Sequence, residues 1–260
     1  MNLPVLLYPA FALLLFAGVW GAFGPPGRAG TWIANGTAGV GWVILSAVIA
    51  LGWMAFERPP FKSFFETYLL LAWCLSSIAL GAAAVAPRGR LFSLACAVAS
   101  GIGFWAVSNP DLETALLPPA LQSPWFVPHV SVYFFGYSTV VLGGLLSLWG
   151  FADAVRRSSL WEVADRLSVC AFLLLGAGLC LGATWADEAW GTWWGWDPKE
   201  SWALVTWLCV AAFRHLPREI RLSARGIWIL VLALGVTAFT YMGMHLLPSA
   251  DLSVHIYSAS

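Results

Sequence analysis

The stretch LSVCAFLLLGAGLCLGATWA, residues 167–186, contains 20 consecutive residues without a charged side chain. An α-helix that crosses the hydrocarbon core of a bilayer needs about 20 mostly apolar residues. This run therefore predicts a transmembrane helix.

Seven further apolar runs accompany this stretch. The eight expected spans lie near residues 3–23, 38–56, 64–86, 91–108, 130–151, 167–186, 198–214 and 226–247. The first run is interpreted as a retained span and not as a signal peptide, because no basic segment precedes it. No internal repeat or polar domain interrupts the pattern. The sequence predicts an all-α integral membrane protein, in which residues 1–260 form a single domain of about eight transmembrane helices.

The composition agrees with a chain that is solvated largely by lipid. Hydrophobic residues make up 60% and charged residues 10% of the sequence, whereas roughly a quarter of the residues in soluble domains are charged. The formal net charge is zero, so no basic surface indicates nucleic acid as a partner. The five cysteines lie in apolar runs without a CxxC pair, and they indicate neither a disulfide framework nor a thiol redox site.

Lysine and arginine are distributed unevenly between the two sets of alternate loops. One set contains ten basic residues: Arg28, Arg88, Arg90, Arg156, Arg157, Arg166, Arg214, Arg218, Arg221 and Arg225. The other set contains three: Arg58, Lys62 and Lys199. Because the more basic loops of membrane proteins face the cytoplasm, both termini and the segment 185–200 are expected on the extracytoplasmic side.

The segment 185–200 joins the sixth and seventh expected spans and is rich in tryptophan. It reads WADEAWGTWWGWDPKE, and its tryptophans are Trp185, Trp190, Trp193, Trp194 and Trp196. One interpretation is an interfacial belt, in which indole rings lie at the level of the lipid headgroups. The other is a flat aromatic surface for a planar ligand, since aromatic pairs gain roughly 0.5–1.5 kcal/mol beyond area burial. The concentration of rings in one loop favours the second interpretation.

The end of this segment has the pattern of a helix N-terminus. Asp197 suits the N-cap, Pro198 the first helical position and Glu200 the third, from which its carboxylate can bond back to the cap. The seventh helix is therefore expected to begin here. Lys199 is not explained by capping, because a cation is mildly disfavoured at a helix N-terminus. It either reaches an anionic group of a ligand or extends its amine to the membrane surface.

Histidines complete the set of candidate ligands. His129 and His255 are expected just outside their spans, on the same side as the tryptophan segment. Two neutral imidazoles beside an aromatic surface can hold a planar metalloporphyrin through its two axial positions. His215 is expected at the opposite face, as an ordinary helix-end histidine or as half of an inner site that a partner completes. His245, at the outer end of the last span, is interpreted as a packing residue or a reserve ligand.

The motif WGTWWGWDPKESW, residues 190–202, closely resembles the WWD signature of haem-handling membrane proteins. Its DPKE part resembles the CcsA-type (ResC-type) proteins of the System II cytochrome c assembly pathway. Four further segments resemble the same family in order: FKSFFET at 61–67, LQSPWFVPHV at 121–130, FRH at 213–215 and VHIYS at 254–258. The WWD match is highly specific, and the order of the others supports it.

The resemblance implies a function for these residues. Haem b would move from an inner site, with His215 as one ligand, to an outer site where His129 and His255 ligate the iron. The WWD residues, Asp197 included, would position the ring while two thioether bonds form to the CxxCH motif of apocytochrome c. A CcsB- or ResB-type membrane protein would supply the second inner histidine. The chain would be one component of a holocytochrome c synthase in a cell inner membrane or a thylakoid-type membrane.

Two departures from the family pattern leave the second outer ligand open between His245 and His255. The tail reads VHIY at 254–257 where the family usually has LHSY, and His245 stands where the family more often has asparagine. His255 is favoured because the tyrosine that follows it matches. Two other functions also stay open: a haem carrier or exporter that takes no part in attachment, and a structural membrane subunit with its tryptophans as an interfacial anchor.

Overall fold

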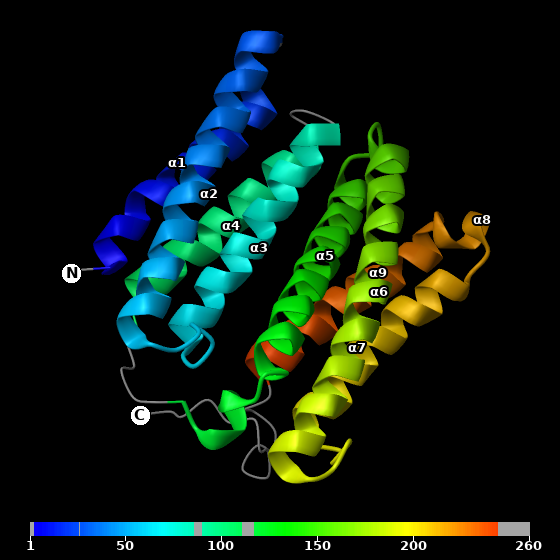
Figure 1. Cartoon of the computed structure of the whole chain (residues 1–260). Helices are drawn as coiled ribbons and strands as arrows, with labels where there is room; N and C mark the ends of the chain where they lie inside the picture. The colour runs from blue at the N-terminus through cyan, green and yellow to red at the C-terminus, as the bar shows by residue number, and fades with distance from the viewer. Residues whose placement is uncertain (1–2, 26, 86–89, 111–116, 244–260) are drawn as a thin grey trace. The chain divides into compact units, whose positions relative to one another are not determined.

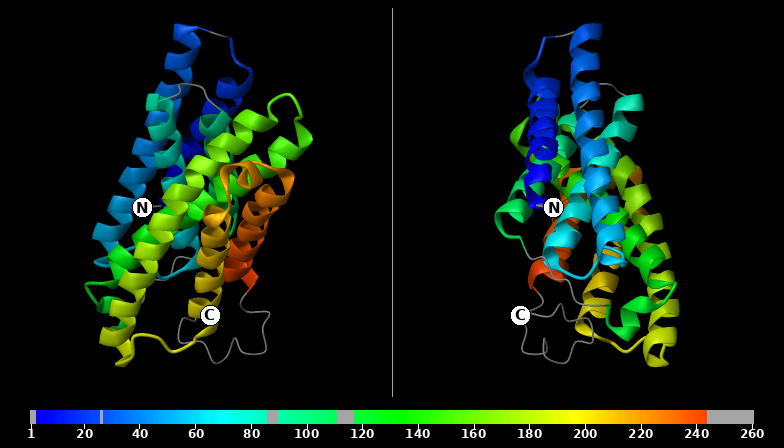
Figure 2. Two further views of the ribbon diagram at one scale, coloured as in Figure 1. Left: turned by 90° about the vertical axis from the view of Figure 1, so that its right-hand side faces the viewer. Right: turned by 60° about the vertical axis from the view of Figure 1, so that its left-hand side comes forward.

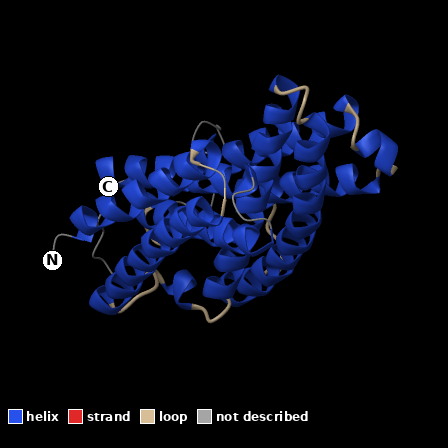
Figure 3. Ribbon diagram, turned by 90° about the horizontal axis from the view of Figure 1, so that it is seen from above, coloured by secondary structure: helices blue, strands red, loops and turns tan. Residues whose placement is uncertain are grey.

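The computed structural model describes residues 3–25, 27–85, 90–110 and 117–243. In these ranges the chain consists of helices and loops without a β-strand (Figures 1 and 3), so the all-α prediction is confirmed. Seven of the helices described there are long and apolar enough to cross a membrane, as expected for a multi-pass membrane protein. The chain divides into two compact units, Met1–Leu117 and Pro118–Ser260, and the single domain over 1–260 stays a prediction.

The seventh expected span is α7, Pro198–His215, which is helical but less apolar than the others. Its 18 residues include three charged ones, Lys199, Glu200 and Arg214. These charges lie in the first and last turns, where water and lipid headgroups can solvate them, and the middle of the helix is uncharged. Each of the eight expected spans therefore corresponds to a helix in the described part of the chain.

The first unit is a ring of four helices: α1 (Leu3–Phe23), α2 (Arg28–Phe56), α3 (Phe64–Val85) and α4 (Arg90–Ser108). Each helix packs against the next along the chain, and α4 returns to pack against α1. Glycine permits the close approach of α1 to its neighbours. A Cβ at Gly41 would lie 2.9 Å from the carbonyl oxygen of Ala10, and one at Gly18 would lie 3.0 Å from that of Ser93. Small residues of this kind are typical of helix contacts in membranes.

Reciprocal hydrogen bonds join α2 to α3. The indole N–H of Trp42 donates to Oγ of Ser77 at 2.8 Å, and the indole N–H of Trp73 donates to Oγ of Ser46 at 2.8 Å. The two indole rings stack with their centroids 5.9 Å apart. Because lipid offers no hydrogen-bond partner to an indole N–H, this arrangement favours one register of the two helices.

The second unit is also a ring of four long helices: α5 (Phe126–Ala152), α6 (Arg157–Trp190), α7 and α9 (Ala224–Ala238). Three short elements complete it: η1 (Pro119–Gln122), α8 (Arg218–Arg221) and η2 (Phe239–Gly243). Consecutive long helices pack together, and α9 closes the ring against α5 (Figure 2). One cluster of its core is formed by Tyr133, Val140, Ala171, Leu175, Ala203, Val210 and Ala233.

An ion-pair network holds one end of this second unit. Asp165 of α6 pairs with Arg214 at the end of α7 at 2.8 Å and with Arg221 of α8 at 2.5 Å. Arg214 also contacts Oγ of Ser168 at 3.4 Å. One carboxylate of α6 therefore binds two consecutive elements, at the end of the unit opposite to the tryptophan segment.

Two helices are at least ten residues longer than the spans predicted for them. α2 begins at Arg28 and not near residue 38, and α6 covers Arg157–Trp190 and not only 167–186. An apolar run predicts the part of a helix that lipid covers, whereas helical hydrogen bonding continues into polar residues beyond it. The 34 residues of α6 extend roughly 51 Å, against a hydrocarbon core of about 30 Å. Trp185 and Trp190 are consequently helical and not part of a loop.

Candidate functional site

The tryptophan segment is divided between the end of α6, a short loop and the start of α7. α6 ends at Trp190, and Gly191 follows with a left-handed backbone at φ 73°. Trp196 also has a positive φ of 55°, which is uncommon for a residue with a side chain. The loop ends at Asp197, the N-cap of α7. Surrounding hydrogen bonds must therefore hold this backbone in place.

Capping residues supply those hydrogen bonds. Oδ1 of Asp197 accepts from the backbone N–H of Lys199 at 2.7 Å. The Glu200 carboxylate accepts from the backbone N–H of Asp197 at 3.2 Å and from that of Gly195 at 2.9 Å. The predicted capping box is confirmed, and Glu200 in addition fixes the loop that precedes it.

Replacing Glu200 with alanine is expected to loosen this loop. The substitution removes the acceptor of two backbone N–H groups, at a cost of about 1 kcal/mol for each hydrogen bond. Thermal denaturation in detergent should show lower stability, and limited proteolysis should become faster within residues 191–197. Glu200→Gln keeps an acceptor oxygen and serves as the control. Equal stability and equal proteolysis of the alanine variant and the parent protein would contradict this role.

His129 lies in an aromatic cluster with the end of α6. Its imidazole stacks on the Trp185 indole, with centroids 5.5 Å apart and an interplanar angle of 23°, and it meets the Tyr133 ring edge-on at 5.0 Å. Trp185 is 3% exposed and donates its N–H to the carbonyl oxygen of Ala120 at 2.7 Å. Trp190 packs on Trp185 at 4.8 Å. The structure therefore brings one candidate ligand and two tryptophans of the segment together.

The other three tryptophans of the segment are arranged differently. Trp194 and Trp196 meet at an interplanar angle of 85°, and Trp185 and Trp190 at 64°, so neither pair is coplanar. Trp193 and Trp196 are 59% and 72% exposed. Nε1 of Trp194 is buried without a hydrogen-bond partner in the described part of the chain. The segment thus combines one buried ring, Trp185, packed against the half-buried ring of Trp190, with two exposed rings and one buried N–H donor.

Sequence reasoning missed the residues of α6 that receive His129. Nδ1 of His129 lies 2.9 Å from the carbonyl oxygen of Gly178. A Cβ at Gly182 would lie 2.6 Å from Cε1 of the same imidazole. The two glycines form a GxxxG motif, GLCLG at 178–182. This spacing is typical of close helix contacts in membranes, and it was the signal that could have identified them.

His215 lies at the end of α7, one residue after Arg214 of the ion-pair network. Its Nδ1 is 2.8 Å from the carbonyl oxygen of Ala211 in the same helix, which fits an ordinary helix-end histidine and leaves the inner-site hypothesis open. The 18 residues of α7 extend roughly 27 Å, so His215 is remote from the tryptophan segment. His245 and His255 lie outside the described residues, and the pairing of His255 with His129 stays a prediction.

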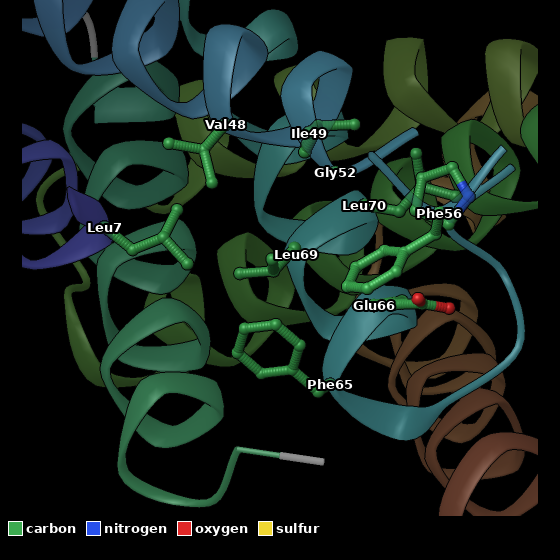
Figure 4. A pocket seen from close by; sticks show the side chains of 10 residues that line it. Leu7, Val48, Ile49, Gly52, Phe56, Phe65, Glu66, Leu69 and Leu70 are labelled. Atoms are coloured by element: carbon green, nitrogen blue, oxygen red, sulfur yellow. The ribbon is translucent and has the colours of Figure 1, made fainter. Parts of the chain in front are cut away.

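A small cavity lies within the first unit, between α1, α2 and α3 (Figure 4). Its lining is apolar except for one carboxylate, and consists of Leu7, Val48, Ile49, Gly52, Phe56, Pro60, Phe65, Glu66, Leu69 and Leu70. The cavity volume is about 40 Å³, which is room for a few water molecules and not for a planar macrocycle. This cavity is therefore not a candidate haem site, whereas the candidate ligand His129 lies in the aromatic cluster of the second unit.

Comparison with known proteins identifies the family. Residues 61–250 match the family described as "Cytochrome C assembly protein". The chain is 32% identical over 294 residues to the cytochrome c biogenesis protein CcsA of Parasynechococcus marenigrum, covering 96% of this chain and 94% of that protein. It is 29% identical over 282 residues to CcsA of Thermosynechococcus vestitus, covering 88% and 86%.

These matches and the helical fold define the class as multi-pass membrane proteins with a role in cytochrome c maturation. The predicted family is thereby confirmed. The chain belongs to the cytochrome c assembly protein family and is a CcsA-type cytochrome c biogenesis protein.

A solved structure shares the fold. The cytochrome c heme lyase CcmF matches 92% of this chain with a TM-score of 0.66 at 18% sequence identity. The match covers 46% of the CcmF chain, so the fold described here corresponds to about half of that longer protein.

Proposed function

We propose that this chain binds haem b at the extracytoplasmic end of its second unit and presents it for covalent attachment to the CxxCH motif of apocytochrome c. The observation that carries the proposal is the position of His129, stacked on Trp185 beside the tryptophan segment. Imidazole is a common axial ligand of haem iron, and indole rings stack well on planar ligands. The family's role in cytochrome c assembly and the fold shared with a haem lyase support the same chemistry.

Attachment requires haem and peptide to be held in one orientation. Each thioether forms by addition of a cysteine S–H across a vinyl C=C bond of haem: sulfur bonds to the inner carbon, and hydrogen goes to the outer carbon. The step involves no net oxidation, so the contribution of the chain is positioning. Orientation of bound reactants can lower a barrier by roughly 7–11 kcal/mol at best. His129 would hold the iron, while the exposed rings of Trp193 and Trp196 would provide surface for the porphyrin or the peptide.

The proposal includes a second, inner site at His215. His129 lies in the first turn of α5 and His215 ends α7, at opposite ends of the second unit, and the basic residues Arg214 and Arg221 lie at the His215 end. If this basic end faces the cytoplasm, haem would enter there and leave beside the tryptophan segment. A CcsB- or ResB-type protein would supply the second inner histidine, and His255 would be the second outer ligand.

Reconstitution tests the proposed function. The full chain is produced with a CcsB-type partner and a reporter c-type cytochrome in bacteria that lack their own cytochrome c assembly proteins. We expect a haem Soret band in the purified membrane complex and covalent haem on the reporter. A Soret band without covalent reporter would indicate a haem carrier or exporter. Absence of both would indicate a structural subunit, and either result would overturn the proposal.

A further inference from the structure

We infer that Gly178 and Gly182 of α6 fix the tautomer and the position of His129, so that Nε2 is the nitrogen that binds iron. This inference rests on the proposed function, because it concerns the same ligand. Nδ1 of His129 lies 2.9 Å from the carbonyl oxygen of Gly178. A carbonyl oxygen can only accept a hydrogen bond, so Nδ1 must carry the proton. In a neutral imidazole the lone pair that a metal requires is then on Nε2.

The two glycines also make the space for the imidazole. A Cβ at Gly182 would lie 2.6 Å from Cε1 and 2.8 Å from Nδ1 of His129, and a Cβ at Gly178 would lie 2.5 Å from Cδ2 of Tyr133. His129 and Tyr133 are four residues apart on α5, and the two glycines are four residues apart on α6. Each ring therefore occupies the space that a side chain at the facing glycine would need. With Trp185 stacked on the imidazole, the ring has little freedom to rotate.

This arrangement has a chemical consequence for a bound iron. A hydrogen bond from Nδ1–H to a backbone carbonyl fixes the ring orientation and raises the basicity of the ligating nitrogen. A more basic nitrogen donates more charge and favours ferric over ferrous iron. The backbone of α6 would therefore lower the reduction potential of the haem that His129 holds, without itself touching the iron.

Gly182→Ala tests the inference in the full-length protein purified with its partner. The added Cβ must displace the imidazole and weaken its bond to Gly178. We expect haem affinity at the outer site to fall about tenfold, within the range known for lost outer-shell partners of metal ligands, and the reduction potential of the haem that remains there to become more positive. Added imidazole should restore part of the haem.

Two glycine variants serve as matched controls. A Cβ at Gly136 would lie 2.8 Å from Cδ2 of Leu175, so Gly136→Ala crowds the same pair of helices away from His129. A Cβ at Gly235 would have no heavy atom within 4 Å. Both variants are expected to keep the haem content and the reduction potential. Equal loss of haem in Gly136→Ala and Gly182→Ala would mean that helix spacing is the cause, and the inference would be wrong.

The remaining outcomes separate this inference from the proposed function. If His129→Ala loses haem but Gly182→Ala keeps it with an unchanged potential, only the inference fails. If His129→Ala keeps as much haem as the parent protein, the outer site included, the proposed function fails at this residue. If Gly182→Ala does not fold, ¹⁵N NMR of histidine-labelled parent protein gives the answer directly, with His129→Phe used to assign the signal. A proton on Nε2 would overturn the inference.

Discussion

His129→Ala is expected to remove haem from the outer site and to stop maturation of a co-produced cytochrome c. The imidazole is the one candidate ligand in the described part of the chain that lies within the aromatic cluster of Trp185 and Tyr133. Loss of an outer-shell partner alone weakens metal binding by about 10–100-fold, so loss of the ligand should reduce haem binding by at least that much. The Soret absorbance per purified protein and covalent haem on the reporter measure the two effects.

A second substitution distinguishes iron ligation by the imidazole nitrogen from packing of the aromatic ring. His129→Phe keeps an aromatic ring against Trp185 and Gly182 but provides no nitrogen to iron. His129→Ala leaves a cavity that free imidazole can enter. We therefore expect imidazole to restore haem binding in the alanine variant and not in the phenylalanine variant. Haem binding and reporter maturation that persist in His129→Phe would exclude this residue as an iron ligand.

The helices could be predicted because lipid imposes a simple rule on the sequence. A charge-free run such as residues 167–186 must satisfy its backbone hydrogen bonds as a helix. The start of α7 could be predicted for a different reason, since the capping box at Asp197 and Glu200 depends only on residues close in sequence. Both predictions rest on local chemistry, which needs no knowledge of how the helices pack.

Features that depend on packing were not predictable in the same way. The sequence interpretation grouped the tryptophans as one flat surface, whereas Trp185 is buried in α6 and Trp196 is exposed in a turn with positive φ. The difference arises because α6 continues to Trp190, past the apolar run. The contact of Gly178 with His129 joins residues 49 positions apart, and only the packing of α5 on α6 brings them together.

The buried charges before α3 also depend on packing and could not be predicted from the sequence. Arg58 belongs to a loop that was expected at the membrane surface, yet it is 4% exposed. Its guanidinium binds both carboxylate oxygens of Glu66, with Nη2–Oε1 at 2.9 Å and Nη1–Oε2 at 3.0 Å. The distribution of basic residues between loops assigns Arg58 to one side of the membrane. It cannot show that Arg58 is buried in an ion pair with a carboxylate eight residues later.

This buried ion pair leads to the largest stability effect that we expect. Oε2 of Glu66 also accepts from the backbone N–H groups of Lys62 at 2.8 Å and Ser63 at 3.2 Å. Glu66→Ala would remove a carboxylate from a buried guanidinium and from two backbone donors at once. Breaking one partner of a buried pair typically costs about 3–5 kcal/mol. Thermal unfolding in detergent should show a large loss of stability in the first unit.

Two comparisons identify the cause of that loss. The double variant Arg58→Met/Glu66→Leu removes both charges, and it should regain most of the stability because apolar replacement of a buried pair is often neutral or stabilising. Glu162→Ala breaks the exposed pair of Glu162 with Arg218, whose atoms are 3.6 Å apart with side chains 49% and 66% exposed, and it should cost less than about 1 kcal/mol.

If Glu66→Ala were no more destabilising than Glu162→Ala, the buried pair would not be what holds the turn between α2 and α3. If the double variant were as unstable as the single one, the loss would come from the backbone donors and not from the uncompensated charge.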